Sequence, residues 1–152
     1  MERSDFPLVD DVEMPTGGGA DGAHVVDYEI QRVLSMGWQQ YVATVRELAG
    51  GDLPPAVVRQ ITTSFESETY GGRLLALGVR ALHRTRRSLV LEEQLWDEGS
   101  GQLVASSRVV VASVDRSSGR APEIAPRLWA AIEAFEGHPI EMIERGTPIT
   151  LW

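Results

Sequence analysis

The chain has 152 residues, a formal net charge of −8 and no cysteine, which excludes disulfides, thiolate metal ligands and a cysteine nucleophile. Its length fits one domain, and the acidic balance argues against nucleic acid as a partner, because phosphate binding needs a basic face. No apolar run approaches the ~20 residues of a membrane span, and the first residues do not open a signal peptide. We therefore expect a soluble, cytoplasmic protein without membrane association.

The N-terminal part of the chain predicts a short strand and then a break. Residues 6–14 can form the strand. Residues 15–23 contain four glycines, which supply backbone freedom and let another group approach closely.

A long amphipathic helix is the clearest element of the sequence. Apolar or small residues recur at steps of three and four, which predicts a helix over 27–48: Ile30, Val33, Leu34, Gly37, Trp38, Tyr41, Val45 and Leu48. Asp27 is expected to cap its start, and Gly50-Gly51 to close its end.

Four extended segments and a second helix follow. The strands are expected at 57–67, 75–81, 89–95 and 103–114, with Val57, Ile61 and Phe65 on one face of the first. Tight turns and the absence of helices between the strands predict an antiparallel sheet. Pro126 opens the short second helix, which Gly137 ends, and the apolar tail is expected to dock on the domain.

The fold class is therefore α+β, with one long helix covering an antiparallel sheet of about five strands and a short C-terminal helix. Three segments carry a family resemblance: residues 21–26 with the helix behind them, residues 84–92, and residues 103–115. Their order and spacing resemble the hotdog-fold thioesterases of the 4-hydroxybenzoyl-CoA and acyl-CoA type. The resemblance implies a single hotdog domain over residues 1–152, with its core at about 8–136 and a C-terminal extension at 137–152.

The resemblance leaves two registers for the catalytic acid. Aligned on His24-Val25, the family's acid position falls on Ala20, which has no acid–base chemistry. Aligned on Asp21, the acid is kept and His24 falls where the family has glycine; we prefer this register. The family's asparagine pair is missing in both.

In the preferred register, Asp21 is the candidate catalytic carboxylate and His24 a second base or an orienting group. The oxyanion would be held by amides at the helix entry: Val25, Val26, Asp27 and Tyr28. The alternatives are a solvated loop aspartate for Asp21 and a structural or exposed side chain for His24. Glu66 and Glu68 are backup acids, which an exposed strand face explains equally well.

A basic turn would bind the phosphates of coenzyme A, with Arg84, Arg86, Arg87 and Ser88 as its candidate contacts. The alternative is an ordinary polar turn. Trp38 and Tyr41 are assigned either to the wall of the acyl pocket or to the core. The three histidines lie far apart in sequence, so no metal site is expected, and no cofactor beyond the coenzyme A of the substrate.

The leading hypothesis is a thioester hydrolase acting on acyl-CoA or an acyl-carrier protein, as a homodimer or a larger homotetramer. The second hypothesis is a non-catalytic hotdog protein that binds an acyl chain or a small hydrophobic ligand. A third is a binding module of another curved-sheet family, such as a cone-shaped barrel.

Overall fold

The computed structural model describes residues 2–15 and 27–144. It contains two α-helices, one 3-10 helix and six strands in this part of the chain. Their bounds, in chain order, are η1 Arg3–Asp5, β1 Leu8–Glu13, α1 Asp27–Ala49, β2 Ala56–Phe65, β3 Leu74–Arg84, β4 Ser88–Asp97, β5 Leu103–Ser113, α2 Pro126–Glu136 and β6 Glu141–Met142.

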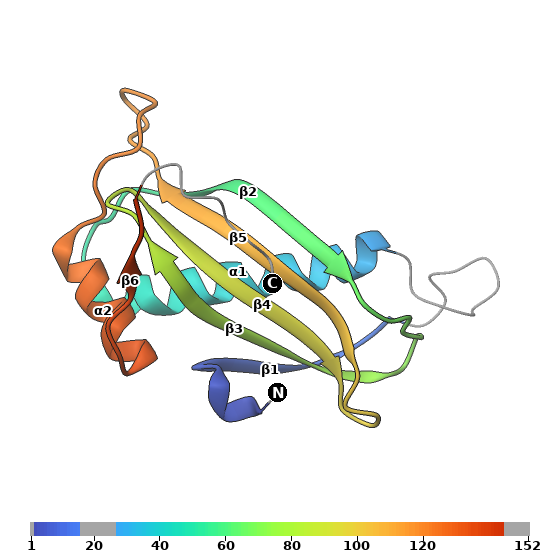
Figure 1. Cartoon of the computed structure of the whole chain (residues 1–152). Helices are drawn as coiled ribbons and strands as arrows, with labels where there is room; N and C mark the ends of the chain where they lie inside the picture. Colours follow the sequence, from blue (N-terminus) through green and yellow to red (C-terminus); the bar gives the residue numbers. More distant parts are fainter. Residues whose placement is uncertain (1, 16–26, 145–152) are drawn as a thin grey trace.

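The strands form one sheet in the order β1-β3-β4-β5-β2, and the neighbours in this order are antiparallel (Figure 1). The short β6 pairs with the end of β3 in the parallel direction. One edge of the sheet is thus shared by β1 and β6, while β2 forms the other edge. Within residues 2–15 and 27–144, no strand pairs with the outer side of β2.

Helix α1 lies across one face of the sheet (Figure 1), and the core fills the space between them. The close approach is made at Gly37, where a Cβ atom would lie 2.8 Å from Leu77 and 3.0 Å from Val79. The largest fully buried apolar side chains come from β1's end, α1, the central strands and α2: Met14, Leu34, Tyr41, Leu75, Leu91, Leu95 and Ile132.

Helix α2 packs beside the C-terminal half of α1. Pro126 occupies its first turn, and Gly137 ends it in the left-handed region at φ 80°, as the sequence predicts. The Glu136 carboxylate accepts from the Tyr41 hydroxyl and from the Ala81 amide, both at 2.5 Å. One carboxylate therefore joins α1, α2 and β3.

The expected element order is confirmed, with three differences in detail. Strand β3 extends to Arg84, so part of the basic segment lies in a strand and the turn holds only residues 85–87. A bulge leaves Arg59 without a partner, so Val58 rather than Val57 packs against the core. The two-residue β6 adds a strand to the five expected, and it docks the start of the C-terminal extension.

The face of the sheet that points away from α1 carries a buried group of ion pairs. Glu92 on β4 is paired with Arg80 on β3 and with Arg108 on β5. Ser107, next to Arg108 on β5, points instead toward α1, so the polar residues of that strand divide between the two faces.

No helix in the described residues has the length and apolarity that crossing a membrane requires.

Candidate functional site

The proposed catalytic loop joins the sheet to the start of α1. Asp21, His24, Val25 and Val26 lie outside the described residues. Asp27 is the first residue of α1, inside its first turn rather than before it, and both Asp27 and Tyr28 are exposed. Amides in this turn have no partner within the helix and carry the positive end of its dipole, so they suit an oxyanion.

The basic segment lies at the junction of β3 and β4, next to α2. The Arg84 guanidinium stacks over the Trp129 ring at 4.6 Å, and its Nε is buried without a hydrogen-bond partner. Arg86 and Arg87 are exposed, and Arg87 donates to the Ala121 carbonyl at 2.5 Å. Two of the three arginines are therefore accessible to an anion.

Ser88 sits in the same turn, where its hydroxyl lies 2.8 Å from that of Thr85. The Thr85 Oγ1 also accepts from the Ser88 amide. These bonds fix the shape of the turn, which explains the Ser88 side chain without a ligand. Its assignment to coenzyme A binding stays a prediction.

The start of α1 and the basic turn lie at opposite ends of the helix within one chain (Figure 1). Helix α1 has 23 residues, about 35 Å at the usual rise. One subunit therefore does not bring Asp27 and Tyr28 together with Arg86 and Arg87.

Trp38 and Tyr41 both lie on α1, and their side chains face the rest of the domain. Tyr41 is fully buried, and burial together with Glu136 raises the pKa of its hydroxyl. Its ring meets Phe135 edge to face, at 5.5 Å between centroids. Trp38 is half-buried, with its indole Nε1 unpartnered. Tyr41 thus has a structural role, and the assignment of both residues to an acyl pocket stays a prediction.

Glu66 and Glu68 follow the end of β2 and are exposed. Ser64 donates to Glu66 at 2.8 Å, and the Tyr70 hydroxyl lies 3.4 Å from Glu68. These neighbours leave both carboxylates open to solvent near the free edge of the sheet.

A line of polar side chains, not anticipated from the sequence, crosses the interface between α1 and the sheet. Thr63 Oγ1 on β2 donates to Gln31 Oε1 on α1 at 2.7 Å, and it lies 3.4 Å from Ser107 Oγ on β5. Glu93 on β4 continues the line inward. The signal was present in the sequence, because Glu93 alternates with Leu91 and Leu95 on a strand face that the pattern assigns to the core.

Glu93 is completely buried, and no cation approaches it from the described residues. Burial raises the pKa of its carboxyl to about 8, although the Trp38 amide and the Ser107 hydroxyl lower it in part. Neither carboxyl oxygen reaches hydrogen-bonding geometry with a described residue. The group is therefore held in its neutral form at pH 7.

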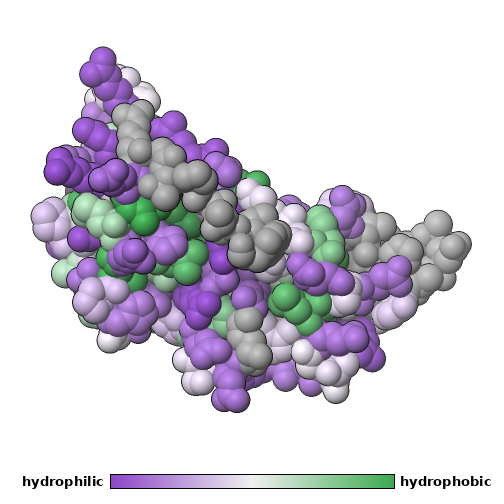
Figure 2. Space-filling model, in the orientation of Figure 1, coloured by the Kyte–Doolittle hydropathy of each residue, from purple (hydrophilic) through white to green (hydrophobic). Residues whose placement is uncertain are grey.

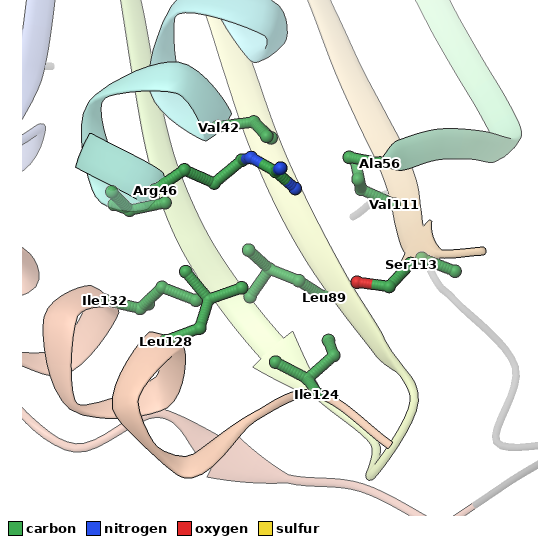
Figure 3. Close-up of a pocket in the computed structure, with 11 residues that line it drawn as sticks. Val42, Arg46, Ala56, Leu89, Val111, Ser113, Ile124, Leu128 and Ile132 are labelled. Carbon is green, nitrogen blue, oxygen red and sulfur yellow. The ribbon is translucent and has the colours of Figure 1, made fainter. Parts of the chain in front are cut away.

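A pocket opens at the other end of α1, between that helix, α2 and the ends of β2, β4 and β5 (Figure 3). Its walls are mainly aliphatic, and its polar side chains are Arg46 and Ser113. Elsewhere the surface face in Figure 2 is largely hydrophilic, with apolar residues in small patches. In residues 2–15 and 27–144, no three metal-ligating side chains gather at one place.

Comparison with known proteins gives matches at the level of structure. No family model matches the sequence, and no curated protein matches it. A Thermus thermophilus thioesterase solved with coenzyme A and zinc has a TM-score of 0.76 and 20% identity, over 92% of this chain and 100% of that one. The SAV2348 protein of Staphylococcus aureus, solved with CoA, has a TM-score of 0.74 and 14% identity, over 94% of each chain.

A third similar structure is the 1,4-dihydroxy-2-naphthoyl-CoA thioesterase of Synechocystis, with a TM-score of 0.69 and 9% identity, over 82% of this chain and 94% of that one. All three likenesses span most of both chains and follow the same helix-on-sheet arrangement. The chain therefore has the hotdog fold, which it shares with the two named thioesterases.

Proposed function

We propose that this protein hydrolyses an acyl thioester of coenzyme A or of an acyl-carrier protein. The observation that carries the proposal is a hotdog fold matched along most of the chain by proteins named as thioesterases, one of which was solved with coenzyme A, as was the similar SAV2348 protein. Fold alone does not determine chemistry, so the residues must also support it.

In the proposed reaction, Asp21 takes a proton from a water molecule as the water oxygen attacks the thioester carbonyl. Amides of the first turn of α1 donate to the oxyanion that forms. The carbon–sulfur bond then breaks, and the thiolate leaves and takes up a proton. This assigns to residues 25–28 a charge-stabilising role for which the start of a helix is suited.

A homodimer joined along β2 would complete the site. The outer side of β2 is unpaired in the described part of the chain, and Ile61 and Phe65 on it are 39% and 49% exposed. An isologous pair of antiparallel β2 strands would set the two α1 helices side by side in opposite directions. The start of one α1 would then face the end of the partner helix, where the partner's basic turn lies.

This arrangement explains why the two candidate clusters lie at opposite ends of α1 in one chain. Coenzyme A held by the arginines of one subunit would present its thioester to the loop of the other. We extend the proposal to a cytoplasmic enzyme without nucleic-acid or membrane partners, with a homotetramer as the larger assembly.

The test is thiol release from a panel of acyl-CoA and aryl-CoA esters, with and without Asp21→Asn. We expect turnover for at least one ester, reduced about 100-fold or more by the substitution. Asp10→Asn is the matched control, since Asp10 is an exposed strand carboxylate whose side chain forms no hydrogen bond or ion pair with the described residues. Turnover that survives Asp21→Asn would remove Asp21 from the mechanism.

The second candidate function has its own outcome in the same experiment. The missing asparagine pair favours a protein that binds acyl groups without hydrolysing them. Saturable binding of an acyl-CoA, with no thiol release from any ester of the panel, would favour that function over the hydrolase.

A further inference from the structure

A row of polar side chains lies beneath the first half of α1, residues 27–36. Thr63 on β2 and Glu93 on β4 are both direct cross-strand partners of Ser107 on β5, so the three lie side by side on the face of the sheet that α1 covers. Gln31 on α1 accepts from the Thr63 hydroxyl at 2.7 Å. Buried polar groups are normally paired with one another, so each member of the row must be accounted for.

Four polar atoms at this interface have no hydrogen-bond partner among the described residues. They are Nε2 of Gln31, Nε1 of Trp38 and both carboxyl oxygens of Glu93, and all four are shielded from solvent. Each has given up hydrogen bonds to water without replacing them, which disfavours the closed interface. Lifting the first half of α1 would return these atoms to water and would therefore cost less than exposing a purely apolar interface.

The two halves of α1 are held in different ways. Tyr41 in the second half donates to Glu136 on α2 at 2.5 Å. Within the described residues, the first half has one side-chain hydrogen bond to the rest of the domain, from Thr63 to Gln31, besides its apolar contacts. The halves meet at Gly37, where glycine weakens the helix. The first half is therefore the part of α1 that can lift separately.

Glu93 has no counter-charge on the face that α1 covers. Its surroundings among the described residues are uncharged: Gly37 and the Trp38 amide of α1, Val79 of β3 and Ser107 of β5. Further along α1, Tyr41 and Glu136 bond to each other. The charged side chains of the adjacent strands point to the other face: Arg80, Glu92 and Arg108. A carboxylate at Glu93 is thus unfavourable while α1 is closed, and water would solvate it if α1 opened.

We propose that the first half of α1 is a flap whose opening is coupled to release of the Glu93 proton. In the closed form the carboxyl is neutral and packed under Gly37. In the open form the flap lifts from the sheet, and water solvates the Glu93 carboxylate and the side chains of Gln31 and Thr63. The proposed oxyanion amides lie at the start of this flap, so opening would also displace them; that consequence alone rests on the proposed function.

The sign and size of the coupling follow from the two protonation states. The pKa of Glu93 is about 8 in the closed form, and it returns toward its ordinary value of 4.5 where water reaches the carboxyl. Only the closed form keeps the proton between these values, so rising pH favours the open form. The open population should rise about tenfold per pH unit and level off above about pH 8.

Amide hydrogen exchange of the wild-type protein tests this, from about pH 5 to about pH 9, with each rate divided by the intrinsic rate at the same pH. We expect the opening constants of amides 33–36 to follow the tenfold dependence up to about pH 8. Dilute urea should change these constants little, because a local opening exposes little surface. Central amides of β4, which exchange by global unfolding, should respond strongly to the same urea.

Three variants locate the coupling. Glu93→Gln keeps the side-chain shape and should give opening constants that no longer depend on pH. Ser107→Ala keeps Glu93 but removes a hydroxyl that lowers its pKa, so the levelling-off should move to higher pH. Glu47→Gln is the control, because Glu47 is an exposed carboxylate in the second half of α1 with no side-chain hydrogen bond or ion pair to the described residues. It should keep the wild-type dependence on pH.

Three outcomes would overturn the proposal. The first is a set of opening constants in the flap that do not change with pH. The second is a pH dependence that persists in Glu93→Gln. The third is a urea dependence in the flap equal to that of β4, which would mean that only global unfolding exposes Glu93. None of these measurements uses a thioester, so a protein that hydrolyses nothing can still open in this way, and an active hydrolase can lack the flap.

Discussion

Two neighbouring glutamates on β4 show how strongly a side chain depends on the face of the sheet that it occupies. Glu92 is buried, which raises its pKa, but Arg108 and Arg80 pair with it and bring the pKa below its ordinary value. Glu93 points to the other face, has no cation nearby among residues 2–15 and 27–144, and its pKa rises to about 8. Charge pairing outweighs burial for the first residue, and burial dominates for the second.

Glu93 should make stability depend on pH. Its ordinary pKa is 4.5, so between pH 4.5 and about 8 the folded protein holds a proton that the unfolded chain has lost. The contribution of this proton to the stability of the fold is complete below pH 4.5 and is lost as the pH rises to about 8. Over this window Glu93 lowers the free energy of unfolding by about 1.4 kcal/mol per pH unit.

We therefore expect Glu93→Gln to remove that slope while keeping the side-chain shape. Urea denaturation at several pH values measures it, as the difference between wild type and variant. Glu13→Gln, on an exposed position of β1, should change the slope little. If the difference between wild type and Glu93→Gln is the same at all pH values, Glu93 does not titrate in this window.

At the scale of elements, the contact between α1 and the sheet depends on a residue without a side chain. Gly37 faces the sheet at the middle of the helix, and a Cβ atom there would lie 2.8 Å from Leu77 Cδ2 and 3.1 Å from Glu93 Oε1. The sheet can come this close only because the position is glycine, although glycine disfavours the helix by about 1 kcal/mol.

Gly37→Ala should destabilise the protein despite its better helix propensity. Overpacking a close contact costs about 1–3 kcal/mol, which exceeds the gain in propensity. We expect a net loss of up to about 2 kcal/mol in the free energy of unfolding, measured by urea denaturation. Gln39→Ala, on the exposed side of α1, should change it by less than about 0.5 kcal/mol. A Gly37→Ala variant more stable than wild type would show that the helix can move away freely.

The sequence predicts an element well where its residue pattern is long, and poorly where a single residue determines the local structure. The periodicity of α1 and the proline and glycine that bound α2 locate both helices. The bulge at Arg59 reverses the face of Val57 with no special residue to indicate it. Strand β6 has two exposed residues, and its pairing depends on β3 rather than on its own composition.

At the scale of the whole molecule, the candidate site was predictable in its parts but not in their arrangement. Residue types and order indicate a carboxylate loop, a helix start and a basic turn. Only the sheet register shows that the turn at residues 85–87 and the helix start at Asp27 lie at opposite ends of α1. Sequence separation carries no information about that distance, and none about the line from Gln31 to Glu93, which joins four elements.

A homodimer joined along β2 would bury Ile61 and Phe65, which makes both positions tests of the assembly. Burying Ile61 and Phe65 against a partner would contribute about 1.5–3 kcal/mol for each side chain, and a lysine at either position would place an unpaired charge in the interface. We expect wild type to sediment as a dimer and Phe65→Lys to raise the dimer dissociation constant at least about 100-fold.

Leu74→Lys is the control, since Leu74 is 50% exposed but lies on β3, away from the β2 edge. Thiol release should fall with the fraction of dimer in Phe65→Lys, because Arg86 and Arg87 would no longer reach the partner's helix start. A wild-type monomer at micromolar concentration, or a fully active monomeric variant, would contradict a site shared between subunits.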